Sequence, residues 1–123
     1  MDSVEDLQPF LPLTPAVFHI LVILAAGEAH GYAIMQEVER MTDGRMQLGP
    51  GTLYRSIDRM LVDELIEKAS SSADERRNVY RISRRGLAVA RAETRRLDAL
   101  VRAARARGLL DGRTPSSRRG AMT

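Results

Sequence analysis

The chain has no cysteine, no tryptophan and only two histidines among its 123 residues. Without cysteine it can form no disulfide framework and offers no thiolate for metal binding or redox chemistry. His19 and His30 are too few for a site built from histidine ligands, and with Glu37 and Glu39 they form no recognisable catalytic pattern. The sequence therefore predicts neither a metal site nor a cofactor, and it argues against an enzyme.

Aromatic residues and long apolar runs are also scarce. Two Phe and three Tyr offer little surface for stacking on unpaired bases, which argues against binding of single-stranded nucleic acid. The longest apolar run, residues 20–26, is far shorter than a membrane span, and the acidic start does not resemble a signal peptide. We therefore expect a cytoplasmic protein without a membrane segment. The hydrophobic content of 44% is enough for one folded domain.

Basic residues are absent from the first third of the chain. Residues 1–39 contain six acidic and no basic side chains, whereas residues 40–123 hold all 19 Lys and Arg residues and ten acids. This segregation, together with an isoelectric point near 9.9, favours a basic surface offered to a polyanion. An ordinary solvated surface is the alternative, because it produces similar imbalances.

Residues 48–61 combine a helix start with an exposed polar face. Pro50 suits the first helical turn, and the small Gly49 and Gly51 allow a phosphate backbone to approach. Apolar residues recur at helical spacing and would face inward. The outward positions carry side chains that can reach DNA, namely Thr52, Tyr54, Arg55, Ser56 and Arg59. This pattern predicts a recognition helix.

Three of the candidate DNA contacts leave alternatives open. Arg55 can read the edge of a guanine or clamp a phosphate. Tyr54 is either a DNA contact or a core residue with its hydroxyl at the edge. Tyr32, at the start of the preceding helix, can present its hydroxyl to the DNA backbone or can pack as a partly buried tyrosine.

Other segments predict two further helices and a hairpin. Thr14 and Pro15 begin a helix to about residue 26, so apolar that it should be a core or dimer helix. A second helix spans about 30–42 and stops at Asp43-Gly44. Residues 65–69 and 78–82 have strand propensity and predict a hairpin, or wing. This wing carries three cations, Lys68, Arg76 and Arg77. They can contact DNA, and the alternative is that they lie on a solvated turn.

The last predicted helix, from about Ser83 to Arg107, repeats small and apolar residues at alternating steps of three and four. This rhythm is typical of a seam against another helix and favours a homodimer, the alternative being a helix that folds back on its own domain. With the inner stripe of the first helix, the predicted dimerisation residues are Val17, Ile20, Leu21, Leu24, Leu87, Ala90, Thr94, Leu97, Val101 and Ala104. The arginines of this helix are expected to form a mainly solvated face.

The sequence thus predicts a mainly α protein with a small β-hairpin, in the form of a winged helix-turn-helix with a long C-terminal dimerisation helix. The predicted divisions are an irregular N-terminal segment at 1–13, the winged helix-turn-helix at 14–83 and the dimerisation helix at 84–107. Residues 108–123, rich in Gly, Ser, Pro and Arg, are expected to be a flexible basic tail.

Several motifs, in their order and spacing, resemble the PadR family of bacterial transcriptional regulators. They are His30-Gly31-Tyr32, Gly51-Thr52-Leu53-Tyr54, Leu65-Ile66, and Tyr80-Arg81-Ile82-Ser83 followed by Gly86. The resemblance covers about residues 14–107 and is closest to the short, single-domain subgroup. Arg55 stands where many family members have proline. The resemblance implies a homodimer that binds an inverted repeat in double-stranded promoter DNA, usually to repress.

The resemblance also suggests a small hydrophobic or phenolic effector, held in a cavity between the first and last helices. His19 would face this region and could make DNA affinity sensitive to pH, although a lone histidine on a helix is more often structural. An alternative function from another class is a winged-helix module that binds an acidic protein and has no specific DNA site, because the same fold serves both purposes.

Overall fold

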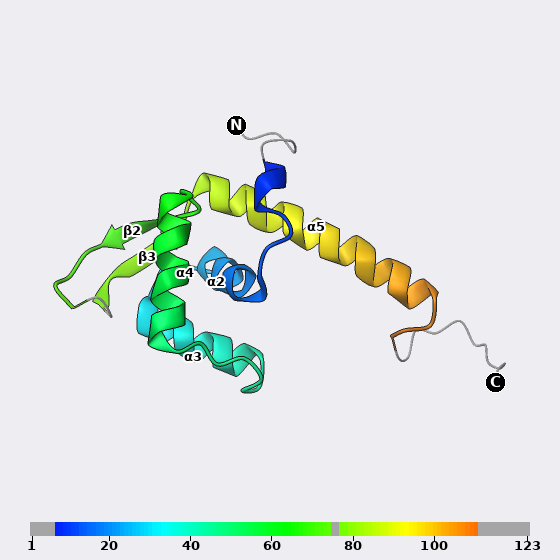
Figure 1. Cartoon of the computed structure of the whole chain (residues 1–123), viewed down its shortest axis with the longest axis horizontal. Helices are drawn as coiled ribbons and strands as arrows, with labels where there is room; N and C mark the ends of the chain where they lie inside the picture. Colours follow the sequence, from blue (N-terminus) through cyan, green and yellow to red (C-terminus); the bar gives the residue numbers. More distant parts are fainter. Residues whose placement is uncertain (1–6, 75–76, 111–123) are drawn as a thin grey trace.

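The fold consists of helices packed around one central helix, with a small antiparallel sheet to one side (Figure 1). The computed structural model describes residues 7–74 and 77–110. Its elements are η1 (Gln8–Phe10), α2 (Pro15–Ala25), β1 (Ala29–His30), α3 (Gly31–Met41), α4 (Pro50–Val62), β2 (Ile66–Ser70), β3 (Val79–Ile82) and α5 (Arg84–Ala106). The predicted fold class, mainly α with a small hairpin, is confirmed. Among the described residues, no helix combines the length and apolarity needed to cross a membrane.

The predicted helix starts are confirmed by their caps. The Thr14 hydroxyl accepts a hydrogen bond from the Val17 N–H at 3.2 Å and begins α2. The Ser83 hydroxyl accepts one from the Gly86 N–H at 2.9 Å and begins α5. Pro50 occupies the first turn of α4, where its missing N–H has no helical partner to lose.

Two helices end in a turn with a left-handed residue, Asp43 (φ of 51°) after α3 and Gly108 after α5. Gly44, with a φ of 77°, donates its N–H to the Glu39 carbonyl at 2.8 Å and closes the end of α3. Gly108 has a φ of 81°, and the following Leu109 N–H reaches the Ala104 carbonyl at 3.0 Å. Both pairs are 6→1 bonds of the Schellman type. The stop predicted at Asp43-Gly44 is therefore confirmed.

The sheet has three strands instead of the predicted two. Its order is β1-β3-β2, with both pairings antiparallel. The added strand pairs Ala29 with Tyr80 and His30 with Val79. A two-residue strand carries no alternating pattern, so the sequence indicated only a break between helices at this point. The pairing joins the start of α3 directly to the wing formed by β2, β3 and their connection.

The prediction of an irregular segment at 1–13 is wrong for its described part, residues 7–13. Leu7 is 5% exposed, and the short helix η1 follows it. Phe10, Leu11 and Leu13 pack against the core. The segment therefore belongs to the folded domain, because its leucines supply apolar surface that the helices alone do not. Residues 1–6 and the predicted tail at 111–123 lie outside the described residues.

A buried carboxylate anchors this N-terminal segment to α5. Glu93 is only 2% exposed, accepts a hydrogen bond from the Leu13 N–H at 3.1 Å and pairs with Arg96 at 2.7 Å. The Arg96 hydrogen bond, which outweighs burial, holds the pKa of Glu93 below its ordinary value. The ionised form therefore stabilises the fold above about pH 4.3, and this contribution is lost as the pH falls through the lowered pKa.

Part of the predicted dimer seam is instead the core of a single chain. Ile20 and Leu21 are fully buried, Leu24 is 2% exposed and Ala90 is 7% exposed. They belong to one cluster with residues from α3, α4 and the sheet. Ile20, Leu21 and Leu24 leave no surface for a second copy, because α2 lies in the middle of the domain and the first half of α5 packs on it (Figure 1). The small exposed part of Ala90 lines a groove between α2 and α5.

The second half of α5 extends beyond the rest of the domain (Figure 1). Leu100 is 59% exposed and Val101 is 45% exposed, while Leu97 and Ala104 are half-buried. A helix of this length measures about 34 Å, more than a domain of this size can cover. Apolar side chains at this end of the helix are therefore available to a partner.

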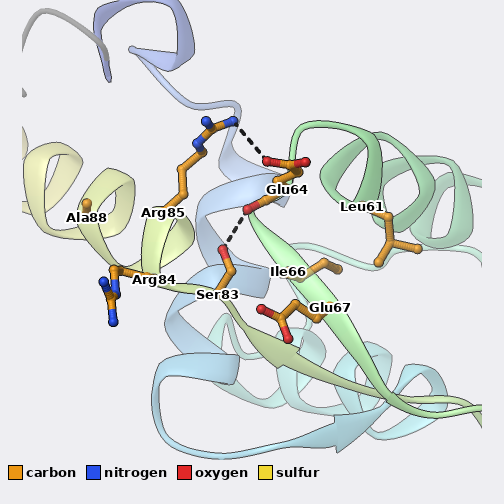
Figure 2. Close-up of a pocket in the computed structure, with 8 residues that line it drawn as sticks. All are labelled: Leu61, Glu64, Ile66, Glu67, Ser83, Arg84, Arg85 and Ala88. Carbon is orange, nitrogen blue, oxygen red and sulfur yellow. Dashed lines mark hydrogen bonds and ion pairs between the residues drawn. The ribbon is translucent and has the colours of Figure 1, made fainter. Parts of the chain in front are cut away.

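The start of α5 is held against the turn after α4 by a close backbone contact. Figure 2 shows Ser83 beside Glu64, whose carbonyl accepts a hydrogen bond from the Ser83 hydroxyl at 2.6 Å. The Arg85 guanidinium lies 3.7 Å from the Glu64 carboxylate. Gly86 has no room for a side chain, because a Cβ there would lie 1.9 Å from the Leu65 carbonyl oxygen.

We expect Gly86→Ala to destabilise the protein. Helix propensity alone would make this change favourable by about 1 kcal/mol, but the clash with the Leu65 carbonyl requires a backbone shift that reverses the sign. Urea denaturation should give a free energy of unfolding lower by at least about 1 kcal/mol. Arg84→Ala, on an exposed residue of the same turn, is the control and should stay within about 0.5 kcal/mol of the parent. A Gly86→Ala protein as stable as the parent would contradict the close packing.

Candidate nucleic-acid interface

Helices α3 and α4, joined by residues 42–49, form a helix-turn-helix whose second helix has one buried and one exposed face. Leu53, Ile57 and Met60 are buried against the core. The opposite face is polar. Of the predicted contacts on α4, Pro50, Gly51, Thr52, Arg55 and Arg59 are exposed and Ser56 is half-buried. The expected orientation of the helix, apolar inward and cationic outward, is thus the observed one.

The two arginines of α4 differ in their partners. Arg55 reaches back toward the start of the helix and donates to the Thr52 hydroxyl at 3.4 Å. Arg59 reaches toward the end of the helix, where its Nε lies 3.2 Å from the Asp63 carboxylate. Because Asp63 partly balances the charge of Arg59, whereas Thr52 is neutral, Arg55 presents the stronger attraction for an anion.

Tyr54 is half-buried and packs between α3 and α4, so its hydroxyl is not exposed for the predicted DNA contact. Its hydroxyl is buried and lies against Gly31 at the start of α3. A Cβ on Gly31 would be 2.6 Å from the Tyr54 hydroxyl oxygen and 2.9 Å from its ring. The tyrosine therefore fills the space that a glycine leaves between the two helices. The alternative of a core residue with its hydroxyl at the edge agrees with this packing but not with the position of the hydroxyl, which is buried.

Tyr32 lies between the wing and the start of α4. It is 52% exposed, and it lines two neighbouring hollows of the surface. One is bounded by α3 and the wing, with His30, Asp74 and Arg77 in its wall. The other is bounded by α3, the helix–helix connection and Pro50. Tyr32 thus joins three elements into one continuous surface.

The wing presents a cation on a fixed backbone. Arg77 has a side chain that is 78% exposed, 3.9 Å from the Asp74 carboxylate. Its N–H donates to the Asp74 carbonyl at 2.9 Å, and its carbonyl lies 3.2 Å from Nδ1 of His30. Lys68 is exposed on β2. The predicted contact Arg76 lies outside the described residues.

A family model described as the transcriptional regulator PadR-like family matches residues 20–92. The chain belongs to this family. The matched range begins inside α2, contains α3, α4 and the wing, and ends inside α5, so it covers all the surface features described above. This PadR-like chain is therefore a DNA-binding transcriptional regulator. None of the curated protein sequences matches it.

Solved structures of transcriptional regulators share the fold. A PadR-like regulator from Bacillus cereus is 21% identical, with a TM-score of 0.63 over 88% of this chain and 98% of the other. A regulator from Clostridium thermocellum is 20% identical, with a TM-score of 0.63 over 84% and 94%. RosR from H. salinarum is 25% identical, with a TM-score of 0.57 over 79% and 97%.

The wing of this PadR-like regulator contains residues that sequence reasoning left without a role. Asn78 is 5% exposed and accepts a hydrogen bond from the Ser72 N–H at 2.5 Å. The Ser72 hydroxyl in turn accepts one from the Asp74 N–H at 3.2 Å. His30 was identified only as part of a motif. The sequence alone does not indicate these hydrogen bonds, because the donor and the acceptor of each bond lie in different strands or on opposite sides of a turn.

The arginines of α5 do not form one solvated face. Arg84, Arg91 and Arg95 are exposed, as expected. Arg96 is exposed as well, and it also pairs with the buried Glu93. The exception is the half-buried Arg85, which donates to the Asp63 carbonyl at 3.1 Å and lies over the Phe10 ring at 6.0 Å. Within the part of the chain that the structure describes, no cluster of three or more acidic or histidine side chains could hold a metal.

The contrast between the two tyrosines can be measured. Tyr32→Phe removes an exposed hydroxyl and should weaken binding to the protein's DNA site about fivefold, equivalent to about 1 kcal/mol. Tyr54→Phe removes a buried hydroxyl and should leave the affinity of the folded protein within about twofold of the parent. Fluorescence anisotropy at one salt concentration measures both, and thermal melting confirms folding. A larger loss for a well-folded Tyr54→Phe protein than for Tyr32→Phe would contradict this assignment.

Proposed function

We propose that this PadR-like regulator is a homodimeric repressor that binds a palindromic promoter site. The observation that carries the proposal is the continuous surface around Tyr32. It joins the start of α4, at Pro50, to the wing through the two hollows that Tyr32 lines. Arg77 on the wing side, the Tyr32 hydroxyl between the hollows and the exposed Arg55 on α4 suit the backbone of duplex DNA.

In the proposed complex, α4 enters the major groove with its N-terminal half nearest the bases. Arg55, paired only with a neutral hydroxyl in the bond described, is the residue that reads a guanine edge or clamps a phosphate. Arg59 contributes less because it shares its charge with Asp63. Arg77 and Lys68 contact the phosphates or minor groove beside the site.

The proposed homodimer forms through the projecting half of α5. Exposed apolar side chains on this half, Leu100 and Val101, are unfavourable in water. A groove between α2 and α5, lined by Val22, Ala25 and Leu87 among others, continues this surface toward the domain. A second copy covers both. Of the predicted dimer residues, Val17, Leu87, Thr94, Leu97, Val101 and Ala104 keep exposed or half-buried surface for this contact.

Two-fold symmetry then sets the form of the DNA site. Two copies of α4 in successive major grooves lie about 34 Å apart along the duplex, so the half-sites form an inverted repeat. A dimer that occupies promoter DNA in this way blocks other proteins from it, which is the proposed route to repression.

A small hydrophobic or phenolic effector is the proposed signal. The α2–α5 groove has an apolar floor, with Arg91 and Arg95 at its rim. This lining suits a molecule with an apolar body and a polar or anionic end. Because the groove adjoins the proposed dimer contact, a bound molecule would change the spacing of the two recognition helices and so the DNA affinity.

A salt series tests the DNA-binding part of the proposal. The parent protein should bind the DNA immediately upstream of its own gene more tightly than a scrambled duplex, with log affinity falling linearly with log salt. Arg55→Ala/Arg59→Ala should bind at least about tenfold more weakly, since one good arginine contact contributes about 1–3 kcal/mol. Arg84→Ala, with an exposed arginine outside α4 and the wing, is the matched control. Equal, weak binding to both duplexes by the parent would instead favour a module that binds an acidic protein.

Charge placed in the α5 seam should separate the proposed dimer. Leu97→Asp/Val101→Asp would bury two carboxylates in an apolar contact, and light scattering should then give the mass of a single chain. Ala99→Asp, on the exposed opposite side of α5, should leave the parent's mass unchanged. A seam variant with the same mass as the parent would rule out this interface.

A further inference from the structure

His30 connects the wing to the helix-turn-helix through its side chain. It is the last residue of β1 and the residue before α3. Its Nδ1 lies 3.2 Å from the carbonyl oxygen of Arg77, which is 47 positions away in the chain. A carbonyl can only accept, so the ring must carry its proton on Nδ1 and donate it.

This bond acts on the residue that carries the exposed cation of the wing. The Arg77 N–H already donates to the Asp74 carbonyl. The His30 ring donates to the Arg77 carbonyl. Both the N–H and the carbonyl of Arg77 are therefore fixed by hydrogen bonds. The side chain is nevertheless 78% exposed. The position from which the guanidinium extends is therefore set, while its end remains available.

Neighbouring bonds make the base of the wing rigid on the same side. The backbone of His30 is opposite Val79 in the sheet. The buried Asn78 holds the Ser72 N–H across the turn. His30, Asp74 and Arg77 line one hollow together with Tyr32. A cation held in this frame loses less conformational freedom on binding than a cation on a mobile turn.

We propose that His30 is a positioning residue for the DNA contact of the wing: it acts through Arg77 by fixing the Arg77 carbonyl. The proposal rests on the proposed mode of DNA binding, in which Arg77 meets the DNA backbone. It assigns a role to the histidine of the His30-Gly31-Tyr32 motif that differs from that of Tyr32. Loss of the hydrogen bond from the His30 ring frees the Arg77 backbone. DNA affinity then falls by a factor of about three to ten.

A double-mutant cycle on the full chain tests this role. His30→Ala should weaken binding to the upstream duplex by that factor and leave the melting temperature and the dimer mass unchanged. In an Arg77→Ala background, His30→Ala should have no further effect, because the residue through which it acts is gone. His30→Asn, whose side-chain amide can donate to the same carbonyl, should keep most of the affinity.

The outcomes distinguish this inference from the proposed function. Additive losses in the cycle would mean that His30 contacts DNA itself, and they would overturn the positioning role. An unchanged affinity of His30→Ala, or a loss in His30→Asn equal to that in His30→Ala, would overturn it as well. Failure of the parent chain to bind any duplex would overturn the proposed function, whatever the variants do.

Discussion

The packing of Tyr54 on Gly31 is the contact on which the rest of the interface depends. A Cβ on Gly31, at the start of α3, would lie 2.6 Å from the Tyr54 hydroxyl oxygen of α4, so any larger residue there would force the tyrosine ring to shift. His30 and Tyr32 flank this glycine, so the same contact fixes the strand that joins the wing and the tyrosine that separates the two hollows. This glycine therefore lies where α3, α4 and the strand next to the wing meet.

The arginines divide into those that hold the fold and those that remain available to DNA. Arg96 compensates a buried carboxylate, and Arg85 closes the α4–β2 turn onto α5. Each satisfies a group that would be costly to bury alone. Arg55 and Arg77 have guanidinium groups directed away from the core, on backbones held by α4 and by the wing. The net charge of +3 therefore includes arginines that hold the fold as well as arginines that stay exposed.

Helix α5 serves the domain with its first half and leaves its second half uncovered. Gly86, Val89, Ala90 and Glu93 are buried within the chain, whereas Leu100 and Val101 are exposed. The division follows from length, because the domain covers only the first part of a helix of about 34 Å.

The sequence by itself determined the helices, their caps, the wing and the family, because these depend on local spacing and on ordered motifs such as Thr14-Pro15 and Gly51-Thr52-Leu53-Tyr54. It predicted the exposed face of α4 because a 3.6-residue period fixes which side chains share a side. Only the tertiary structure decided that the Tyr54 hydroxyl is buried, that Ile20 and Leu24 are core residues rather than dimer contacts, that Glu93 holds Leu13, and that His30 reaches Arg77. These facts depend on which distant segments meet, and periodicity along one element carries no information about the surface against which that element packs.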